Sequence, residues 1–108
     1  MIQEISARDA ASHRENAPPG ECTLLDVRED KELLLARIDG AVHIPMTDIP
    51  RRMGELDPRK EVIVFCHHGQ RSYKVAAFLK QQGFPTVKSL AGGIDAWSLE
   101  VDPTVPRY

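Results

Sequence analysis

The chain lacks the features of a disulfide scaffold, a nucleic-acid-binding protein or a membrane protein. Its 108 residues include two cysteines, too few for a disulfide framework. Fourteen basic and sixteen acidic residues give a net charge of −2, without the basic excess typical of nucleic-acid binding. No apolar run approaches the roughly 18 residues that a membrane-spanning helix needs. We therefore expect no nucleic-acid partner and no membrane partner.

A secretory signal is also missing, because no cationic segment followed by an apolar run stands at the N-terminus. The expected location is therefore the cytoplasm, where a reducing environment keeps free thiols intact. A chain of this length buries enough surface for one hydrophobic core without staples. We expect residues 1–108 to form one domain.

Apolar runs alternate with helical patterns along the chain. Unalternating runs predict short strands covered on both faces, at 22–27, 41–44, 62–66 and 87–90. Helical patterns fall at 7–16 with Ser6 as cap, after the charged segment 28–32, at 47–50 with Thr47 or Asp48 as cap, at 72–82, and at 94–99 after the turn at Gly92 and Gly93. Alternating strands and helices predict an α/β domain with a parallel sheet, and such sheets bind ligands at the carboxyl ends of their strands.

The segment 62–72 carries the strongest chemical signal. A strand-like run ends in Cys66, a short loop containing Gly69 and Arg71 follows, and the helical pattern begins at Ser72. A curled loop can aim several N–H groups inward, and the start of a helix adds unpaired N–H groups and the positive end of its dipole. Together with the charge of Arg71, these groups would stabilise a thiolate, which is the nucleophilic form of cysteine. We predict that Cys66 is a reactive nucleophile.

The loop 66–72, Cys-His-His-Gly-Gln-Arg-Ser, resembles the active-site loop of single-domain rhodaneses, the thiosulfate sulfurtransferases. Three further segments resemble signatures of this family, in the family's order. They are 24–29 (Leu-Leu-Asp-Val-Arg-Glu), 38–45 (Ile-Asp-Gly-Ala-Val-His-Ile-Pro) and 90–97 (Leu-Ala-Gly-Gly-Ile-Asp-Ala-Trp). Four motifs in the right order are far more specific than a lone Cys-x4-Arg.

The resemblance implies a three-layer α/β/α sandwich around a five-stranded parallel sheet. It also implies a double displacement that needs no metal and no organic cofactor. Cys66 would take a sulfur atom from a donor such as thiosulfate and become a persulfide. An acceptor such as cyanide, a small thiol or a protein would then remove that sulfur.

Loop length separates this chemistry from that of phosphatases of the same fold, whose loop is one residue longer, Cys-x5-Arg. Four residues stand between Cys66 and Arg71, and this tighter ring suits a single sulfur atom better than phosphate. Sulfurtransferase therefore ranks above phosphatase or arsenate reductase. A binding module that relays or senses persulfide sulfur, with little thiosulfate activity, stays open as an alternative.

The loop residues have distinct expected roles. The cradle for the sulfur would come from the backbone N–H groups of His67, His68, Gly69, Gln70 and Arg71, with Ser72 opening the helix behind it. The side chains of His67, His68 and Arg71 would supply positive character for the donor. Adjacent histidines are poorly placed to chelate one ion, so we expect no metal site.

Two supporting residues are expected near the loop. The strand that contains Asp26 ends at the same edge of the sheet as the cysteine loop, so we predict that Arg71 pairs with Asp26. Arg28 would support the site from the same segment. By contrast, Cys22 and Trp97 are expected to pack in the interior, and the tail 101–108 to be irregular.

Overall fold

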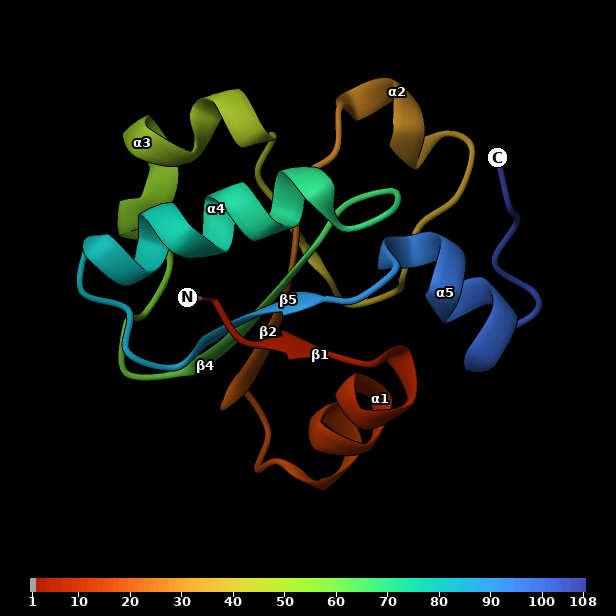
Figure 1. The fold of residues 1–108 in the computed structure, drawn as a ribbon, viewed down its shortest axis with the longest axis horizontal. Helices are drawn as coiled ribbons and strands as arrows, with labels where there is room; N and C mark the ends of the chain where they lie inside the picture. Colours follow the sequence, from red (N-terminus) through yellow and green to blue (C-terminus); the bar gives the residue numbers. More distant parts are fainter. Residues whose placement is uncertain (1) are drawn as a thin grey trace.

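A computed structural model describes residues 2–108 and shows a five-stranded, all-parallel sheet with helices on both faces (Figure 1). The strand order is β1-β5-β4-β2-β3. The strands are β1 (Glu4–Ile5), β2 (Cys22–Asp26), β3 (Val42–His43), β4 (Glu61–Phe65) and β5 (Val87–Leu90). The helices are α1 (Ala7–Asn16), α2 (Asp30–Leu33), α3 (Ile49–Arg52), α4 (Gln70–Gln81) and α5 (Gly93–Glu100), with short 3₁₀ turns η1 (Met46–Asp48) and η2 (Met53–Glu55).

The central strand β4 shows how the sheet divides the core. Successive side chains of a strand point to opposite faces. Val62, Val64 and Cys66 accordingly join one apolar cluster, which packs against α3 and α4. Ile63 and Phe65 join the other cluster, which packs against α1 and α5. The expected three-layer α/β/α sandwich is confirmed (Figure 1).

Most predicted elements form where the sequence places them. The Ser6 hydroxyl caps α1 by accepting from the backbone N–H of Asp9. Trp97 is buried, as expected, and the tail after α5 has no helix or strand of its own. No helix within residues 2–108 has the length and apolar character needed to cross a membrane.

The structure corrects two local expectations and adds one strand that the sequence does not predict. Helix α4 begins at Gln70, not Ser72, because Gly69 adopts a φ of 111° that turns the chain into the helix two residues earlier. Neither Thr47 nor Asp48 caps the short helix α3 with its side chain. Strand β1 was not predicted, because a two-residue strand leaves no sequence pattern and exists only through its pairing with β5.

The register of β2 and β4 positions the site. Asp26 lies beside Phe65, the last residue of β4, and the backbone N–H of Val27 donates to the Phe65 carbonyl at 3.1 Å. Both chains leave the sheet immediately afterwards. The segment after β2 and the loop that begins at Cys66 therefore emerge side by side at the carboxyl edge.

Candidate functional site

The sulfur of Cys66 is buried at the end of β4 and receives backbone hydrogen bonds from the loop that follows. The residue is 1% exposed. The N–H of Gly69 donates to Sγ at 3.1 Å, and the N–H of Ser72 donates at 3.4 Å. Of the five N–H groups expected from residues 67–71, that of Gly69 bonds the sulfur in this structure, and Ser72 joins it from the first turn of α4. These amides and the N-terminal end of the α4 dipole favour a negatively charged sulfur.

Helix α5 holds the other side of the loop. Its first N–H groups are unpaired within the helix, and they bond the loop instead: Ile94 donates to the Cys66 carbonyl at 2.9 Å, and Asp95 donates to the His67 carbonyl at 3.2 Å. Gly93 sits at a φ of 61°, and a Cβ there would collide with the same two carbonyl groups. From the sequence, Gly93 is part of a turn and of the 90–97 signature, without an assigned contact. The structure makes it the point of contact between α5 and the cysteine loop.

A pair of serines lies behind the sulfur. The Ser72 hydroxyl is 2.8 Å from the hydroxyl of Ser89 on β5, and both residues are buried. Ser72 Oγ also lies 3.6 Å from Cys66 Sγ and donates to the Gly69 carbonyl at 3.2 Å. Sequence reasoning missed Ser89, because a single serine within an apolar strand gives no sign of the partner across the sheet.

The prediction that Arg71 pairs with Asp26 is wrong, because Arg71 pairs with Glu32 instead. Its Nη1 and Nη2 atoms donate to the two carboxylate oxygens of Glu32, at 2.7 and 2.9 Å. This bidentate pair holds the pKa of Glu32 down at about 2 and raises the pKa of Arg71. Glu32 lies on α2 within the charged segment 28–32. That segment holds three carboxylates close together, and the sequence does not show which of them faces Arg71.

Asp26 is engaged by the nearer cation, Arg28. Nη2 of Arg28 donates to Asp26 Oδ2 at 2.7 Å, and both side chains are buried. Nη1 and Nη2 of Arg28 also donate to the carbonyls of Glu32 and Ala36, respectively, and Nη1 donates to the Tyr108 hydroxyl as well. The two predicted supporting residues thus lie together beneath the site, where they connect the end of β2 to α2 and to the chain that follows it.

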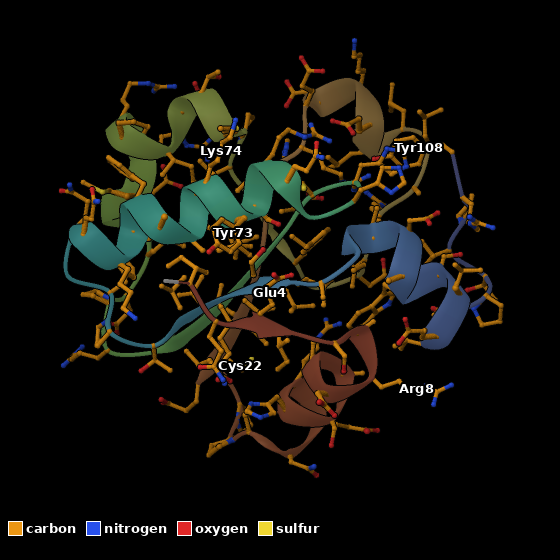
Figure 2. All side chains as sticks on the ribbon, viewed as in Figure 1. Glu4, Arg8, Cys22, Tyr73, Lys74 and Tyr108 are labelled. Atoms are coloured by element: carbon orange, nitrogen blue, oxygen red, sulfur yellow. The ribbon has the colours of Figure 1, made fainter. Side chains whose placement is uncertain are left out.

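Tyr108 closes the site from the tail. Its ring lies on the ring of His67 with centroids 3.9 Å apart and planes 7° apart, and His68 stacks against His67 at 3.9 Å. Figure 2 shows Tyr108 between α2 and the loop that precedes α4. The tail is irregular, as expected, yet its last side chain is a wall of the site. No sequence signal linked residue 108 to residue 67.

Two open hollows flank the loop. His68, Gly69 and Gln70 line one of about 660 Å³, together with Tyr73 and Lys74 on α4. The second, of about 630 Å³, lies beside Arg71, and its other lining residues are Glu29, Lys31, Glu32, Leu34, Leu35 and Tyr108. The loop therefore has an open surface on each side, although its sulfur is buried.

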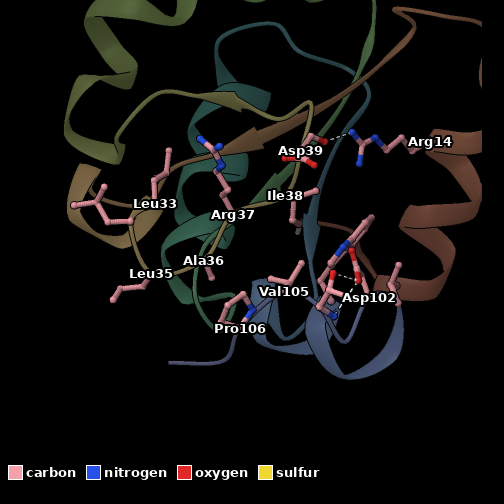
Figure 3. Close-up of a pocket in the computed structure, with 14 residues that line it drawn as sticks. Arg14, Leu33, Leu35, Ala36, Arg37, Ile38, Asp39, Asp102, Val105 and Pro106 are labelled. Atoms are coloured by element: carbon pink, nitrogen blue, oxygen red, sulfur yellow. Dashed lines mark hydrogen bonds between the residues drawn. The ribbon is translucent and has the colours of Figure 1, made fainter.

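A third hollow lies away from the cysteine loop. It measures about 540 Å³, and Arg14, Arg37, Asp39 and Trp97 are among the residues that line it (Figure 3). None of residues 66–72 reaches it. This hollow is therefore not part of the candidate site.

Cys22 stands apart from this chemistry. It begins β2, at the opposite end of the strands from Cys66, and Figure 2 places it near α1. Partial burial, with the carboxylate of Glu61 close by, raises the pKa of the Cys22 thiol to about 11. A neutral thiol is a poor nucleophile. Cys22 is only partly buried, so the prediction that it packs in the interior is met in part.

Comparison with known proteins agrees with this geometry. The rhodanese-like domain family matches residues 6–100. The candidate sulfurtransferase YtwF of Bacillus subtilis is 44% identical over 102 residues, covering 94% of this chain and 96% of that protein. The thiosulfate sulfurtransferase GlpE of Actinobacillus pleuropneumoniae is 36% identical, covering 97% and 94%. A rhodanese-related protein of Thermoplasma volcanium superposes with a TM-score of 0.84 at 31% identity, over 99% of this chain and all of that one. The chain therefore belongs to the rhodanese-like family.

Proposed function

We propose that this protein is a sulfurtransferase that takes sulfane sulfur from thiosulfate and passes it on through a persulfide on Cys66. One observation carries the proposal: Cys66 Sγ accepts two backbone N–H groups inside a loop that has only four residues between Cys66 and Arg71. The names of its relatives, which include a thiosulfate sulfurtransferase, support the same chemistry.

The reaction has two displacements. In the first, the Cys66 thiolate attacks the outer sulfur of thiosulfate, an S–S bond to Cys66 forms, and the bond to the sulfite sulfur breaks. Sulfite leaves with the electron pair of that bond, so the total charge of −3 is unchanged. In the second, cyanide or a thiolate attacks the terminal sulfur, and the S–S bond to Cys66 breaks with its electron pair returning to Sγ. The acceptor leaves with the sulfur, as thiocyanate in the case of cyanide, and the Cys66 thiolate is regenerated.

We expect the loop to stabilise the negative charge of the persulfide's terminal sulfur as well as that of the Cys66 thiolate. The negative charge of a persulfide rests on its outer sulfur, which lies farther from Cβ than Sγ does. We expect the N–H groups of residues 67–71 that do not bond Sγ to stabilise that outer sulfur, in the manner of an oxyanion hole. His67 and His68, when protonated, would attract the anionic donor. Asp26 and Arg28 would support the loop from beneath, with residues 1–108 acting as one domain.

Thiocyanate formation from thiosulfate and cyanide tests the proposal. We expect the wild type and Cys22→Ser to turn over at similar rates, and Cys66→Ser to be inactive. After incubation with thiosulfate alone, the intact mass of the wild type should rise by one sulfur atom, and cyanide should remove it. This measurement follows the covalent step itself.

Other outcomes separate the alternatives. A protein that gains sulfur from a persulfide donor, but turns over no thiosulfate, is a relay or sensor, and the thiosulfate assignment is then wrong. Hydrolysis of p-nitrophenyl phosphate without any gain of sulfur would overturn the proposal in favour of phosphate chemistry.

A further inference from the structure

Tyr108 makes contacts to three parts of the site that come from different segments of the chain. Its hydroxyl bonds Glu32 on α2 and Arg28 after β2, and its ring stacks on His67 in the cysteine loop. These residues lie 76, 80 and 41 positions away in the sequence. The side chain therefore joins the tail, the charged segment and the cysteine loop.

The hydroxyl joins two ion pairs. It donates to Glu32 Oε1 at 2.8 Å and accepts from Arg28 Nη1 at 3.0 Å. Burial raises the pKa of the Tyr108 hydroxyl, so the group stays protonated and able to donate at neutral pH. Because Glu32 in turn holds both Nη atoms of Arg71, the hydroxyl helps fix the position of that guanidinium.

The ring fixes His67. Nε2 of His67 is buried and has no hydrogen-bond partner among residues 2–108. The ring is instead held between two others, with Tyr108 on one side and His68 on the other, both at 3.9 Å between centroids. Stacking of this kind is favourable and sets the orientation of the ring planes. Removal of the Tyr108 ring would free His67 to rotate beside the nucleophile.

We propose that Tyr108 is a positioning residue that orients the donor-binding side chains of the site, His67 through its ring and Arg71 through Glu32. The inference rests on the proposed function, because it assigns these side chains to the sulfur donor. Tyr108 itself does not contact Cys66. Its replacement should therefore weaken the half-reaction with thiosulfate and leave the half-reaction with cyanide unchanged.

Two substitutions separate the hydroxyl from the ring. Tyr108→Phe keeps the stack on His67 and loses the two hydrogen bonds of the hydroxyl, whereas Tyr108→Leu loses the stack and both hydrogen bonds. We expect kcat/KM for thiosulfate to fall about threefold in Tyr108→Phe, on the scale of one lost hydrogen bond. In Tyr108→Leu, which also loses the aromatic stack, it should fall about tenfold. Both losses should arise mostly from a higher KM. The kcat/KM for cyanide should stay at the wild-type value in both.

Ser12→Ala is the control. It removes a hydroxyl from α1 that accepts from the Asn16 side-chain amide at 3.2 Å and lines neither hollow beside the cysteine loop. Both kinetic constants should be unchanged in this variant. Equal losses for thiosulfate and cyanide in Tyr108→Leu, accompanied by a lower Tm, would identify a purely structural role and overturn the proposal.

NMR gives a readout that does not depend on activity. The ring current of Tyr108 should shift the ring protons of His67 upfield, and this shift should persist in Tyr108→Phe and disappear in Tyr108→Leu. Unchanged His67 resonances in Tyr108→Leu would contradict the positioning role. If the wild type neither turns over thiosulfate nor gains sulfur on Cys66, the proposed function fails. The assignment of His67 and Arg71 to donor binding then fails with it. The His67 shifts still decide whether Tyr108 orients the His67 ring.

Discussion

Arg71 and Glu32, 39 residues apart, meet in two parallel N–H···O bonds of 2.7 and 2.9 Å beside the cysteine loop. The pair ties the first turn of α4 to α2. Glu32 also accepts from the Glu29 backbone N–H at 2.9 Å and from the Tyr108 hydroxyl at 2.8 Å. Four donors around one carboxylate favour its ionised form strongly, and this has a measurable consequence for stability.

Glu32→Gln should destabilise the protein at neutral pH and have much less effect in acid. The folded state holds the pKa of Glu32 at about 2, below the ordinary value of 4.5. The ionised carboxylate therefore contributes stability above about pH 4.5, and this contribution is lost as the pH falls towards 2. We expect a loss of about 2 kcal/mol in the free energy of unfolding at pH 7, measured by urea titration.

Glu55→Gln is the control for this measurement. Glu55 pairs with Arg52 on the surface at 2.9 Å, and exposed pairs of this kind contribute little. Its free energy of unfolding should not differ measurably from that of the wild type. If Glu32→Gln lowers the free energy of unfolding by as much at pH 2.5 as at pH 7, the ionised pair is not the source of the loss.

Gly93→Ala should disrupt the contact between α5 and the cysteine loop. A Cβ at this position meets the carbonyls of Cys66 and His67, and the positive φ is itself unfavourable for alanine. We expect a loss of about 2–4 kcal/mol in unfolding free energy and a matching loss of thiocyanate production. Gly54→Ala, where nothing lies within 4 Å of the added Cβ, should be near neutral. Equal stability of the two variants would refute the close-contact argument.

The two cysteines should differ sharply in reactivity. At pH 7.5 a small alkylating reagent should label Cys66, whose sulfur accepts two amide N–H groups, well before Cys22. Burial and the nearby Glu61 keep the Cys22 pKa at about 11, so its labelling should accelerate only as the pH approaches that value. Peptide mapping after timed quenching measures both rates, and faster labelling of Cys22 at pH 7.5 would contradict this assignment.

Ser89→Ala should slow sulfur transfer through Ser72. The substitution removes the partner 2.8 Å from the Ser72 hydroxyl, which lies next to Cys66 Sγ. We expect a fall of about threefold in kcat/KM for thiosulfate, on the scale of one hydrogen bond. A double-mutant cycle with Ser72→Ala is the check, because Ser89→Ala should have no further effect once Ser72 has lost its hydroxyl. Additive losses would mean that Ser89 acts by another route.

Local sequence determined the strand–loop–helix unit that carries Cys66. An apolar run of strand length, a glycine able to adopt positive φ and an amphipathic helix are properties of neighbouring residues, so they can be read from the chain directly. The order of the four motifs then indicated the family and its three-layer fold. Even here, the start of α4 was misplaced by two residues, because the conformation of Gly69 is not visible in its sequence neighbours.

The tertiary structure decided which groups meet around the loop. The sequence predicts Asp26 as the partner of Arg71. In the structure Arg28 binds Asp26 from only two residues away, and Arg71 pairs with Glu32 on α2 instead. Ser89 and Tyr108 reach the site across the sheet and from the tail. Side-chain pairing of this kind depends on positions in space that chain folding sets, and residues distant in the sequence leave no periodic signal of their proximity.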